Sequence, residues 1–197
     1  MKCGKPLNRE EQEFCGDCEK HRHFFLEGRA AFPYTGKIQR SLLQFKLHNR
    51  RTYGAFFAGA MAAKFQDYEK IWKIDLICPI PLHPKKRRFR GYNQAELLAV
   101  PIGSAFGIPV IPGLLKKKTE TSEQKELDRK NRQKNLKKAF QIGQYDVKLK
   151  RILLVDDVYT TGSTIDAAAA VLKEAGAAEV FFLTACIGTE KEETEET

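Results

Sequence analysis

RILLVDDVYTTGST, residues 151–164, is the stretch that decides the fold of this chain. Residues 152–155 are branched apolar residues followed directly by two acids, a pattern typical of a strand that is buried on both faces and ends at a site. A turn rich in hydroxyl groups follows, and a helical pattern then runs from Ser163 to the stop signal at Ala175 and Gly176. The sequence therefore predicts a strand, a polar turn and a helix in direct succession.

The polar turn is expected to bind a phosphate. The first backbone N–H groups of a helix and the positive end of its dipole attract an anion. Gly162 lets the backbone approach that anion closely and adopt a positive φ. The hydroxyl groups beside it belong to Thr160, Thr161, Ser163 and Thr164.

The two acids before the turn, Asp156 and Asp157, would repel a phosphate, so they are expected to face a different group. Sugar hydroxyls donate hydrogen bonds to carboxylates, and divalent cations bind carboxylate oxygens. A ribose 5-phosphate is the simplest ligand that satisfies both halves of the stretch. A strand ending in two acids also occurs in P-loop ATPases, but the chain contains no G-x-x-x-x-G-K-[ST] motif.

Length and charge limit the remaining possibilities. The chain has 197 residues, enough for one α/β domain and a small appendage. Its net charge of +9 indicates an anionic partner, either a phosphorylated metabolite or nucleic acid. No run of about 18 apolar residues and no apolar N-terminal stretch is present, so we expect no membrane insertion, no signal peptide and a cytoplasmic location.

Three cysteines near the N-terminus predict a structural zinc site. Cys15 and Cys18 form a C-x-x-C pair, and Cys3 begins a stretch typical of the other knuckle of a zinc ribbon. One ligand is missing from this set. His21 or His23 would complete the tetrahedron, with His21 the first choice, or the native chain begins upstream of Met1.

The middle of the chain predicts an edge strand or hairpin at 24–34, then two helices, at 38–47 and at about 50–68, that cap the domain. Lys46, near the joint between these helices, is placed to reach a bound pyrophosphate. The alternative is a solvated basic face.

A second cationic segment follows the strand expected at 74–81. Pro79 and Pro81 remove two backbone donors, so a loop is expected at 82–92. Five cations lie within it: Lys85, Lys86, Arg87, Arg88 and Arg90. Loops at the carboxyl ends of parallel strands face the ligand crevice, so these cations are expected to share a crevice with the acids. A nucleic-acid surface is equally consistent, because both ligands carry phosphates.

Residues 116–138 are highly charged and lack an apolar stripe, which predicts a long flexible loop. Such loops are often lids, and this one carries Arg132 and Lys134. Strands are expected at 139–142 and 179–187. The alternation of strand and helix throughout favours a parallel α/β sheet.

Residues 151–164 have the pattern of type I phosphoribosyltransferases, and the resemblance extends further. The cysteine knuckles, the stretch PIPLHPKKRRFRGYNQAELLA at 79–99, the charged stretch at 119–140 and LLVDDVYTTGST at 153–164 resemble the ComF competence family over nearly the whole chain. This resemblance implies a parallel sheet flanked by helices, a small N-terminal zinc-ribbon-like segment and a hood. It also implies 5-phosphoribosyl 1-pyrophosphate (PRPP) as ligand, Mg²⁺ bound with it, and a link to DNA uptake in natural transformation.

We expect the chain to consist of three parts. Residues 1–23 would form the zinc-ribbon-like segment and residues 24–188 the phosphoribosyltransferase-like domain. The flexible loop 116–138 would lie within that domain, and residues 189–197 would be a disordered acidic tail.

The resemblance also implies roles for individual residues. Asp156 and Asp157 would hold the ribose hydroxyls, and the loop containing Arg132 and Lys134 would take part in catalysis. The 5-phosphate would lie against Thr160, Thr161, Gly162, Ser163 and Thr164. The pyrophosphate would lie near the cations Lys46, Lys86, Arg88 and Arg90.

Two departures from the family pattern affect these expectations. The family shows C-x-x-C twice, whereas the first knuckle here contains only Cys3. Several purine-transferring relatives place an acid where this chain has Thr160, which weakens the case for a purine acceptor. Loss of pyrophosphate from PRPP would be assisted by electrostatic stabilisation of the leaving group. The rival hypothesis is a non-catalytic, single-stranded DNA-binding competence factor that acts with other competence proteins.

Overall fold

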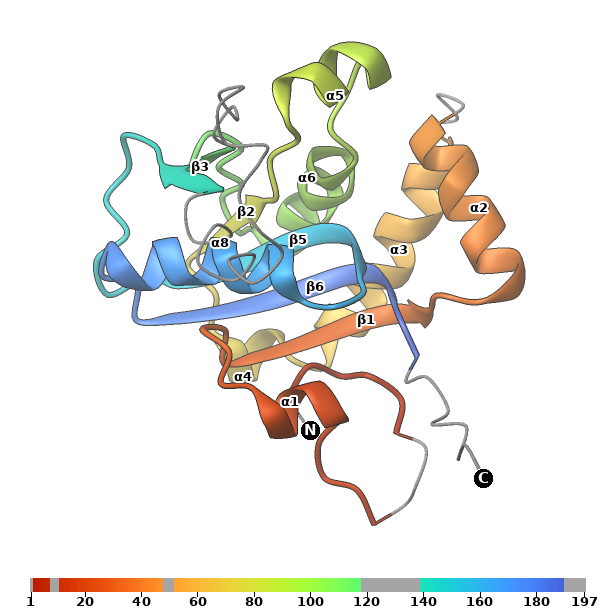
Figure 1. Cartoon of the computed structure of the whole chain (residues 1–197). Helices are drawn as coiled ribbons and strands as arrows, with labels where there is room; N and C mark the ends of the chain where they lie inside the picture. The colour runs from red at the N-terminus through yellow and green to blue at the C-terminus, as the bar shows by residue number, and fades with distance from the viewer. Residues whose placement is uncertain (1, 8–10, 48–51, 118–138, 190–197) are drawn as a thin grey trace, which may run out of the picture.

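A parallel four-stranded sheet forms the centre of the molecule in the computed structural model (Figure 1), which describes residues 2–7, 11–47, 52–117 and 139–189. The strands are β1 (Glu27–Pro33), β2 (Leu76–Pro79), β5 (Arg151–Tyr159) and β6 (Glu179–Ile187), in the order β1-β6-β5-β2. Every neighbouring pair in this sheet is parallel. The predicted parallel α/β sheet is confirmed, and β1 is the edge strand expected within 24–34.

The central position of β5 follows from its sequence. Ile152, Leu153, Leu154 and Val155 are buried, and β5 has β6 on one side and β2 on the other. Ile152 and Leu154 belong to one apolar core, whereas Leu153 and Val155 belong to a second. Since successive residues of a strand point to opposite faces, the two cores cover the two faces of the sheet.

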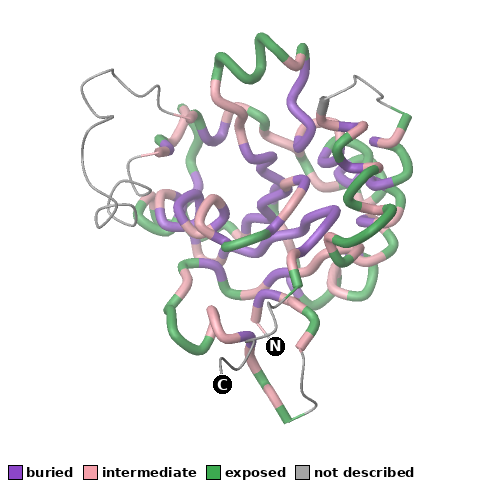
Figure 2. The backbone as a smooth tube through the Cα atoms, turned by 45° about the vertical axis from the view of Figure 1, so that its right-hand side comes forward, coloured by how far each residue is buried: buried purple, intermediate pink, exposed green. Residues whose placement is uncertain are grey.

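Helices on one face belong to the core around Leu153 and Val155. They are α2 (Gly36–Leu47), α3 (Thr52–Gln66), α4 (Glu69–Trp72) and α6 (Gln94–Phe106). Among the described residues, no helix is both long enough and apolar enough to cross a membrane. Figure 2 shows the buried backbone concentrated in the strands and in the helix faces that pack on them.

The other face is covered by α8 (Ser163–Glu174) and by the N-terminal segment, which includes the short helix α1 (Gly16–Lys20). The backbone N–H of Gly28 in β1 donates to the carbonyl of Lys2, 2.9 Å away, so the N-terminus lies along the sheet edge. A small antiparallel pair, β3 (Leu115–Lys117) and β4 (Phe140–Ile142), packs next to α8. Residues 118–138, expected to be a flexible loop, lie between β3 and β4 and outside the described residues.

One sequence expectation was wrong. The segment expected to be a loop at 82–92 contains the helix α5 (Pro84–Arg90). The His83 side chain accepts a hydrogen bond from the Lys85 backbone N–H, and Pro84 occupies the first turn, where its missing N–H costs nothing. Gly91 ends the helix at a φ of 76°. These caps, with lysine and arginine as good helix formers, outweigh the repulsion between adjacent cations.

Candidate functional site

The two acids of β5 lie in different surroundings. Asp157 is 8% exposed and lies on the face covered by α2, where its Oδ1 is 2.9 Å from Nζ of Lys46. Lys46 stands in the last turn of α2, so an ion pair joins the end of that helix to the end of the strand. The sequence placed Lys46 near the ligand, but it did not foresee this partner.

Asp156 points the other way and accepts a hydrogen bond at Oδ1 from the backbone N–H of Asp157, 2.8 Å away. Burial and the neighbouring Asp157 carboxylate raise the pKa of Asp156 to about 8, against the opposing effects of that hydrogen bond, Lys46 and Lys117. A ligand that supplies hydroxyl donors or positive charge at this carboxyl would favour its ionised form. The pair can therefore accept hydrogen bonds from a sugar or hold a divalent cation.

The turn after β5 is the segment for which the sequence predicts a phosphate site. Gly162 has a φ of 73°, and a Cβ built on it would lie 2.3 Å from Oη of Tyr159, so glycine is required by both conformation and space. Residues 158–165 line a small hollow, which we call the phosphate seat. At its edge the hydroxyls of Thr161 and Ser163 are 3.0 Å apart. The seat also includes Thr160, Gly162 and Thr164, and its first residue, Val158, follows the acid pair directly.

A chain of hydrogen bonds connects Lys46 to one cation of the α5 region. Nε2 of Gln94 donates to the backbone carbonyl of Lys46 at 3.4 Å, and Nη1 of Arg90 donates to Oε1 of Gln94 at 3.2 Å. Gln94 is 1% exposed, so this bridge is buried at its centre. Arg90 is thereby tied to the Lys46–Asp157 pair.

Lys86 and Arg88 are exposed on α5, whereas Arg87 pairs with Glu96 at 3.4 Å. The geometry brings Arg90 toward the acid pair but leaves Lys86 and Arg88 in solvent. Arg132 and Lys134, the two cations expected in the catalytic loop, lie outside the described residues.

The three N-terminal cysteines form a cluster. Their Sγ atoms all lie within 4.8 Å of one another, and those of Cys3 and Cys15 are 3.3 Å apart. A hydrogen bond from Cys18, together with Lys5 and Cys15, lowers the pKa of Cys3 to about 6 despite its burial, whereas the pKa values of Cys15 and Cys18 are raised. Thiolates at this spacing are suitable zinc ligands. Among the described residues the cluster consists of these cysteines, and His21 is exposed outside it.

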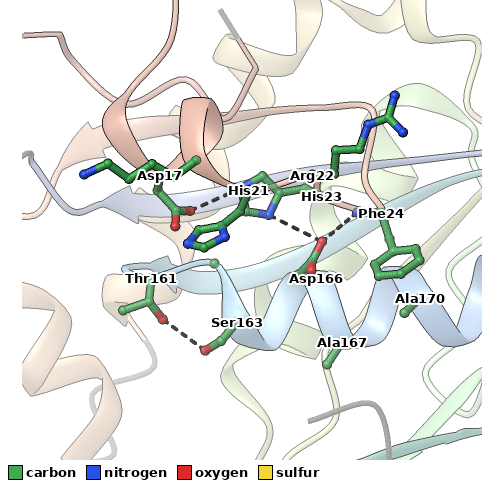
Figure 3. Close-up of a pocket in the computed structure, with 12 residues that line it drawn as sticks. Asp17, His21, Arg22, His23, Phe24, Thr161, Ser163, Asp166, Ala167 and Ala170 are labelled. Carbon is green, nitrogen blue, oxygen red and sulfur yellow. Dashed lines mark hydrogen bonds and ion pairs between the residues drawn. The ribbon is translucent and has the colours of Figure 1, made fainter. Parts of the chain in front are cut away.

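A cavity of about 330 Å³ lies between α1 and the start of α8 (Figure 3). We call it the α1–α8 cavity. Its lining includes Lys20, Arg22, Phe24, Ser163, Ala167 and Ala170. His23 is held at its wall between two carboxylates, with Nε2 3.2 Å from Oδ2 of Asp17 and Nδ1 3.5 Å from Oδ1 of Asp166.

Comparison with known proteins identifies the family. Residues 98–197 match the phosphoribosyl transferase domain. Competence protein F of Haemophilus influenzae is 31% identical over 187 residues, covering 90% of this chain and 80% of that protein. The chain belongs to the ComF family. The resemblance stated from the sequence is therefore confirmed.

The chain is also similar to other proteins and to solved structures. Competence protein ComFC of Bacillus subtilis is 27% identical, covering 89% of this chain and 72% of that protein. DNA utilization protein YhgH of Salmonella typhi is 35% identical, covering 54% of this chain and 46% of that protein. The crystal structure of a purine phosphoribosyltransferase from Pyrococcus horikoshii matches with 20% identity and a TM-score of 0.43, covering 73% of this chain and 93% of that one.

Sequence reasoning missed two features of this ComF chain, Gln94 and the α1–α8 cavity. Gln94 occupies the first turn of an ordinary-looking helix, and only its burial distinguishes it. The cavity is formed by segments far apart in the chain, so no local pattern marks it. The cluster of Lys20, His21, Arg22 and His23 was the available signal, and the histidines were considered only as zinc ligands.

Proposed function

We propose that this chain binds PRPP together with Mg²⁺ and acts as a phosphoribosyltransferase-like protein in DNA uptake. The observation that carries the proposal is the succession of Asp156, Asp157 and the phosphate seat on one strand and turn. Carboxylates for ribose hydroxyls and amide and hydroxyl donors for a 5-phosphate lie side by side there.

Each part of PRPP has a partner in this proposal. Asp156 and Asp157 accept hydrogen bonds from the ribose hydroxyls, and the phosphate seat binds the 5-phosphate. Lys46, paired with Asp157, and Arg90, joined to Lys46 through Gln94, attract the pyrophosphate in this proposal. Lys86, Arg88, Arg132 and Lys134 are the further cations assigned to the pyrophosphate. The carboxylate oxygens suit Mg²⁺, which would supply positive charge to the pyrophosphate.

If a pentosyl group is transferred, the contribution of the chain is electrostatic. Loss of pyrophosphate leaves positive charge on the ribose and negative charge on the leaving group. Carboxylates beside the ribose and cations beside the pyrophosphate stabilise these opposite charges. Among the described residues, Asp156 and Asp157 supply the negative charge, and Lys46, 2.9 Å from Asp157, supplies positive charge together with Arg90, which is joined to it through Gln94.

Zinc has a separate, structural role in this proposal. Cys3 and Cys15 are buried in the same apolar core as Phe25 and Tyr159, so the metal would fasten the N-terminal segment to the sheet. Cys18 is the third ligand. His21 remains the proposed fourth.

A second candidate function is non-catalytic binding of single-stranded DNA. The exposed cations Lys85, Lys86 and Arg88 favour it, as does Phe89, which is 83% exposed beside them. Cations that follow a phosphate backbone and an aromatic ring that stacks on a base are the usual means of such binding. One relative is named a DNA utilization protein.

A thermal-shift titration separates the two functions. PRPP with Mg²⁺ is expected to raise the melting temperature, and ribose 5-phosphate is expected to do so more weakly. Single-stranded DNA is tested at two salt concentrations, since binding that neutralises phosphates weakens steeply with salt. Stabilisation by DNA with no response to PRPP would refute the first function in favour of the second.

A further inference from the structure

The α1–α8 cavity adjoins the phosphate seat, and the acid pair lines neither hollow. Thr161, Gly162 and Ser163 line both hollows. Neither Asp156 nor Asp157 lines the cavity. In Figure 1 the N-terminal segment and β3 lie on opposite sides of α8, and Lys117 of β3 is among the charges that influence Asp156. A phosphate in the seat would therefore have the ribose site on one side and this cavity on the other.

The cavity is longer than a bound phosphate alone would require. Its lining follows α8 from Ser163 to Ala170, which corresponds to roughly 10 Å of helix at about 1.5 Å per residue. A volume of about 330 Å³ lies at the small end of ligand pockets, which range over roughly 300–1,000 Å³. One nucleoside is a ligand of this size.

The lining is apolar on one part and cationic on another. Ala167 and Ala170 present methyl groups from α8, and Phe24, 39% exposed, stands near them (Figure 3). Lys20, His21 and Arg22 are exposed residues of the opposite wall. An apolar surface with an aromatic ring suits a base, and adjacent cations suit a neighbouring phosphate.

The two acids of the cavity do not oppose such a ligand. Oδ1 of Asp166 accepts from the backbone N–H of Phe24 at 2.6 Å and also faces His23, and Asp17 pairs with His23. One oxygen of each carboxylate is therefore turned toward a partner within the protein. The exposed charges that remain on this wall are the cationic ones already named together with Glu19 at the solvent side of α1.

We propose that the α1–α8 cavity binds the nucleoside on the 5′ side of a phosphodiester whose phosphate lies in the seat. The seat then binds an internal phosphodiester of single-stranded nucleic acid, and not only the terminal phosphate of a mononucleotide. This inference rests on the proposed function, because it uses the same phosphate seat. It explains why a phosphoribosyltransferase-like site belongs to a family with DNA-related names.

Two isomers of equal composition test the proposal. With its phosphate in the seat, thymidine 3′-monophosphate places its nucleoside in the cavity, whereas thymidine 5′-monophosphate places it toward the acids. We expect Phe24→Ala to weaken the 3′ isomer about tenfold, as is usual for loss of one stacking partner, and to leave the 5′ isomer unchanged. Arg22→Ala should weaken binding of a short oligothymidylate. Affinities are measured by calorimetry.

Matched variants control for general effects. Leu26→Ala removes an exposed apolar side chain two residues from Phe24 that does not line the cavity, and Arg40→Ala removes an exposed arginine of α2. Neither should alter the ratio between the isomers. An equal effect of Phe24→Ala on both isomers, or none on either, would overturn the proposal while PRPP binding stands. Failure of PRPP and of both isomers to bind the parent protein would instead refute the proposed function.

Discussion

Nζ of Lys46 and Oδ1 of Asp157 lie 2.9 Å apart, with both side chains largely buried. Lys46 lies in the last turn of α2, and Asp157 lies near the end of β5. The pair therefore fastens α2 to the strand that carries the candidate site. The lysine offsets the charge of one acid and leaves Oδ2 of Asp157 free of this pairing. The ion pair thereby orients a carboxylate that the proposed function assigns to ribose.

Breaking this pair from the lysine side should destabilise the protein. Lys46→Met leaves the Asp157 carboxylate largely buried without its cation, which is expected to cost about 1–3 kcal/mol in the free energy of unfolding. Adding Asp157→Asn removes the unpaired charge and should restore most of that loss. Urea unfolding of both single variants and the double variant measures the coupling. Strictly additive effects would show that the pair contributes nothing.

The raised pKa of Asp156 predicts a pH dependence of stability. Between about pH 4 and pH 8 the folded chain retains a proton that the unfolded chain releases, because the pKa is about 8 in the fold and 3.8 in the reference state. The contribution of Asp156 to the free energy of unfolding therefore decreases as the pH rises through this window and is lowest above pH 8. Asp156→Asn cannot titrate and should gain stability relative to the parent toward pH 8.

Asp67→Asn is the matched control for that experiment, because it removes an exposed carboxylate far from β5 in the chain. Thermal melts of parent and both variants between pH 5 and pH 8.5 make the comparison. If the difference in melting temperature between parent and Asp156→Asn stays constant across this pH range, the raised pKa of Asp156 is contradicted.

The cysteine cluster predicts about one zinc per chain in purified protein. Cys3→Ser should remove most of the metal, whereas Cys78→Ala, which alters a buried cysteine outside the cluster, should retain it. Comparing His21→Ala with His23→Ala identifies whether either histidine is the fourth ligand. Metal analysis that finds no zinc in folded, reduced protein would refute the zinc site.

The structural features that the sequence predicted best are those determined by residues close together in the chain. The buried strand and the helix after it could be predicted because residues 152–155 are continuously apolar and Gly162 precedes a helical pattern. The cysteine cluster could be predicted because a C-x-x-C pair on a turn brings two Sγ atoms together through local geometry alone. The α5 helix was missed because the loop was inferred from Pro79 and Pro81, without regard to the capping residues His83, Pro84 and Gly91.

The parts that could not be predicted depend on packing between distant segments. Lys46 meets Asp157 only because the last turn of α2 lies near the end of β5, and nothing near Lys46 in the sequence specifies an acid partner. Gln94 joins the site through two hydrogen bonds, to Lys46 and from Arg90, whose partners depend on how α6 docks. Tertiary contacts of this kind have no period or motif to reveal them.

Gly162→Ala should disturb the phosphate seat. The new Cβ would meet Oη of Tyr159 at 2.3 Å, and the φ of 73° is itself strained for alanine, so a loss of about 1–3 kcal/mol in stability and weaker phosphate binding are expected. Gly107→Ala separates the two causes, since its φ is 66° but no atom lies within 4 Å of the added Cβ. Gly107→Ala should therefore lose less stability than Gly162→Ala.

Tyr159→Phe tests the steric half of that prediction. The hydroxyl of Tyr159 is buried and has no hydrogen-bond partner among the described residues, so its removal should cost little. In Gly162→Ala protein the same change removes the nearest clashing atom and should recover part of the stability. Calorimetric melts make the comparison, and a double variant no more stable than Gly162→Ala would show that contact with the Tyr159 hydroxyl does not cause the loss.

Asp156→Asn combined with Asp157→Asn should weaken PRPP binding by about a hundredfold or more while preserving the fold. The amide is nearly isosteric with the carboxylate, so packing at the end of β5 is kept. What is lost is charge toward two ribose hydroxyls, and each hydrogen bond to a charged group contributes about 1.5–3 kcal/mol, whereas about 1.4 kcal/mol corresponds to tenfold in affinity.

Inorganic phosphate supplies the internal control for this double variant, because it needs only the phosphate seat. Removing two nearby negative charges should leave phosphate affinity unchanged or increase it. The variant therefore separates the two halves of the site: a ligand with a sugar loses affinity, and a bare anion does not. Calorimetry that finds the same PRPP affinity in parent and variant would show that these carboxylates do not hold the ribose, and the proposed function would fail with them.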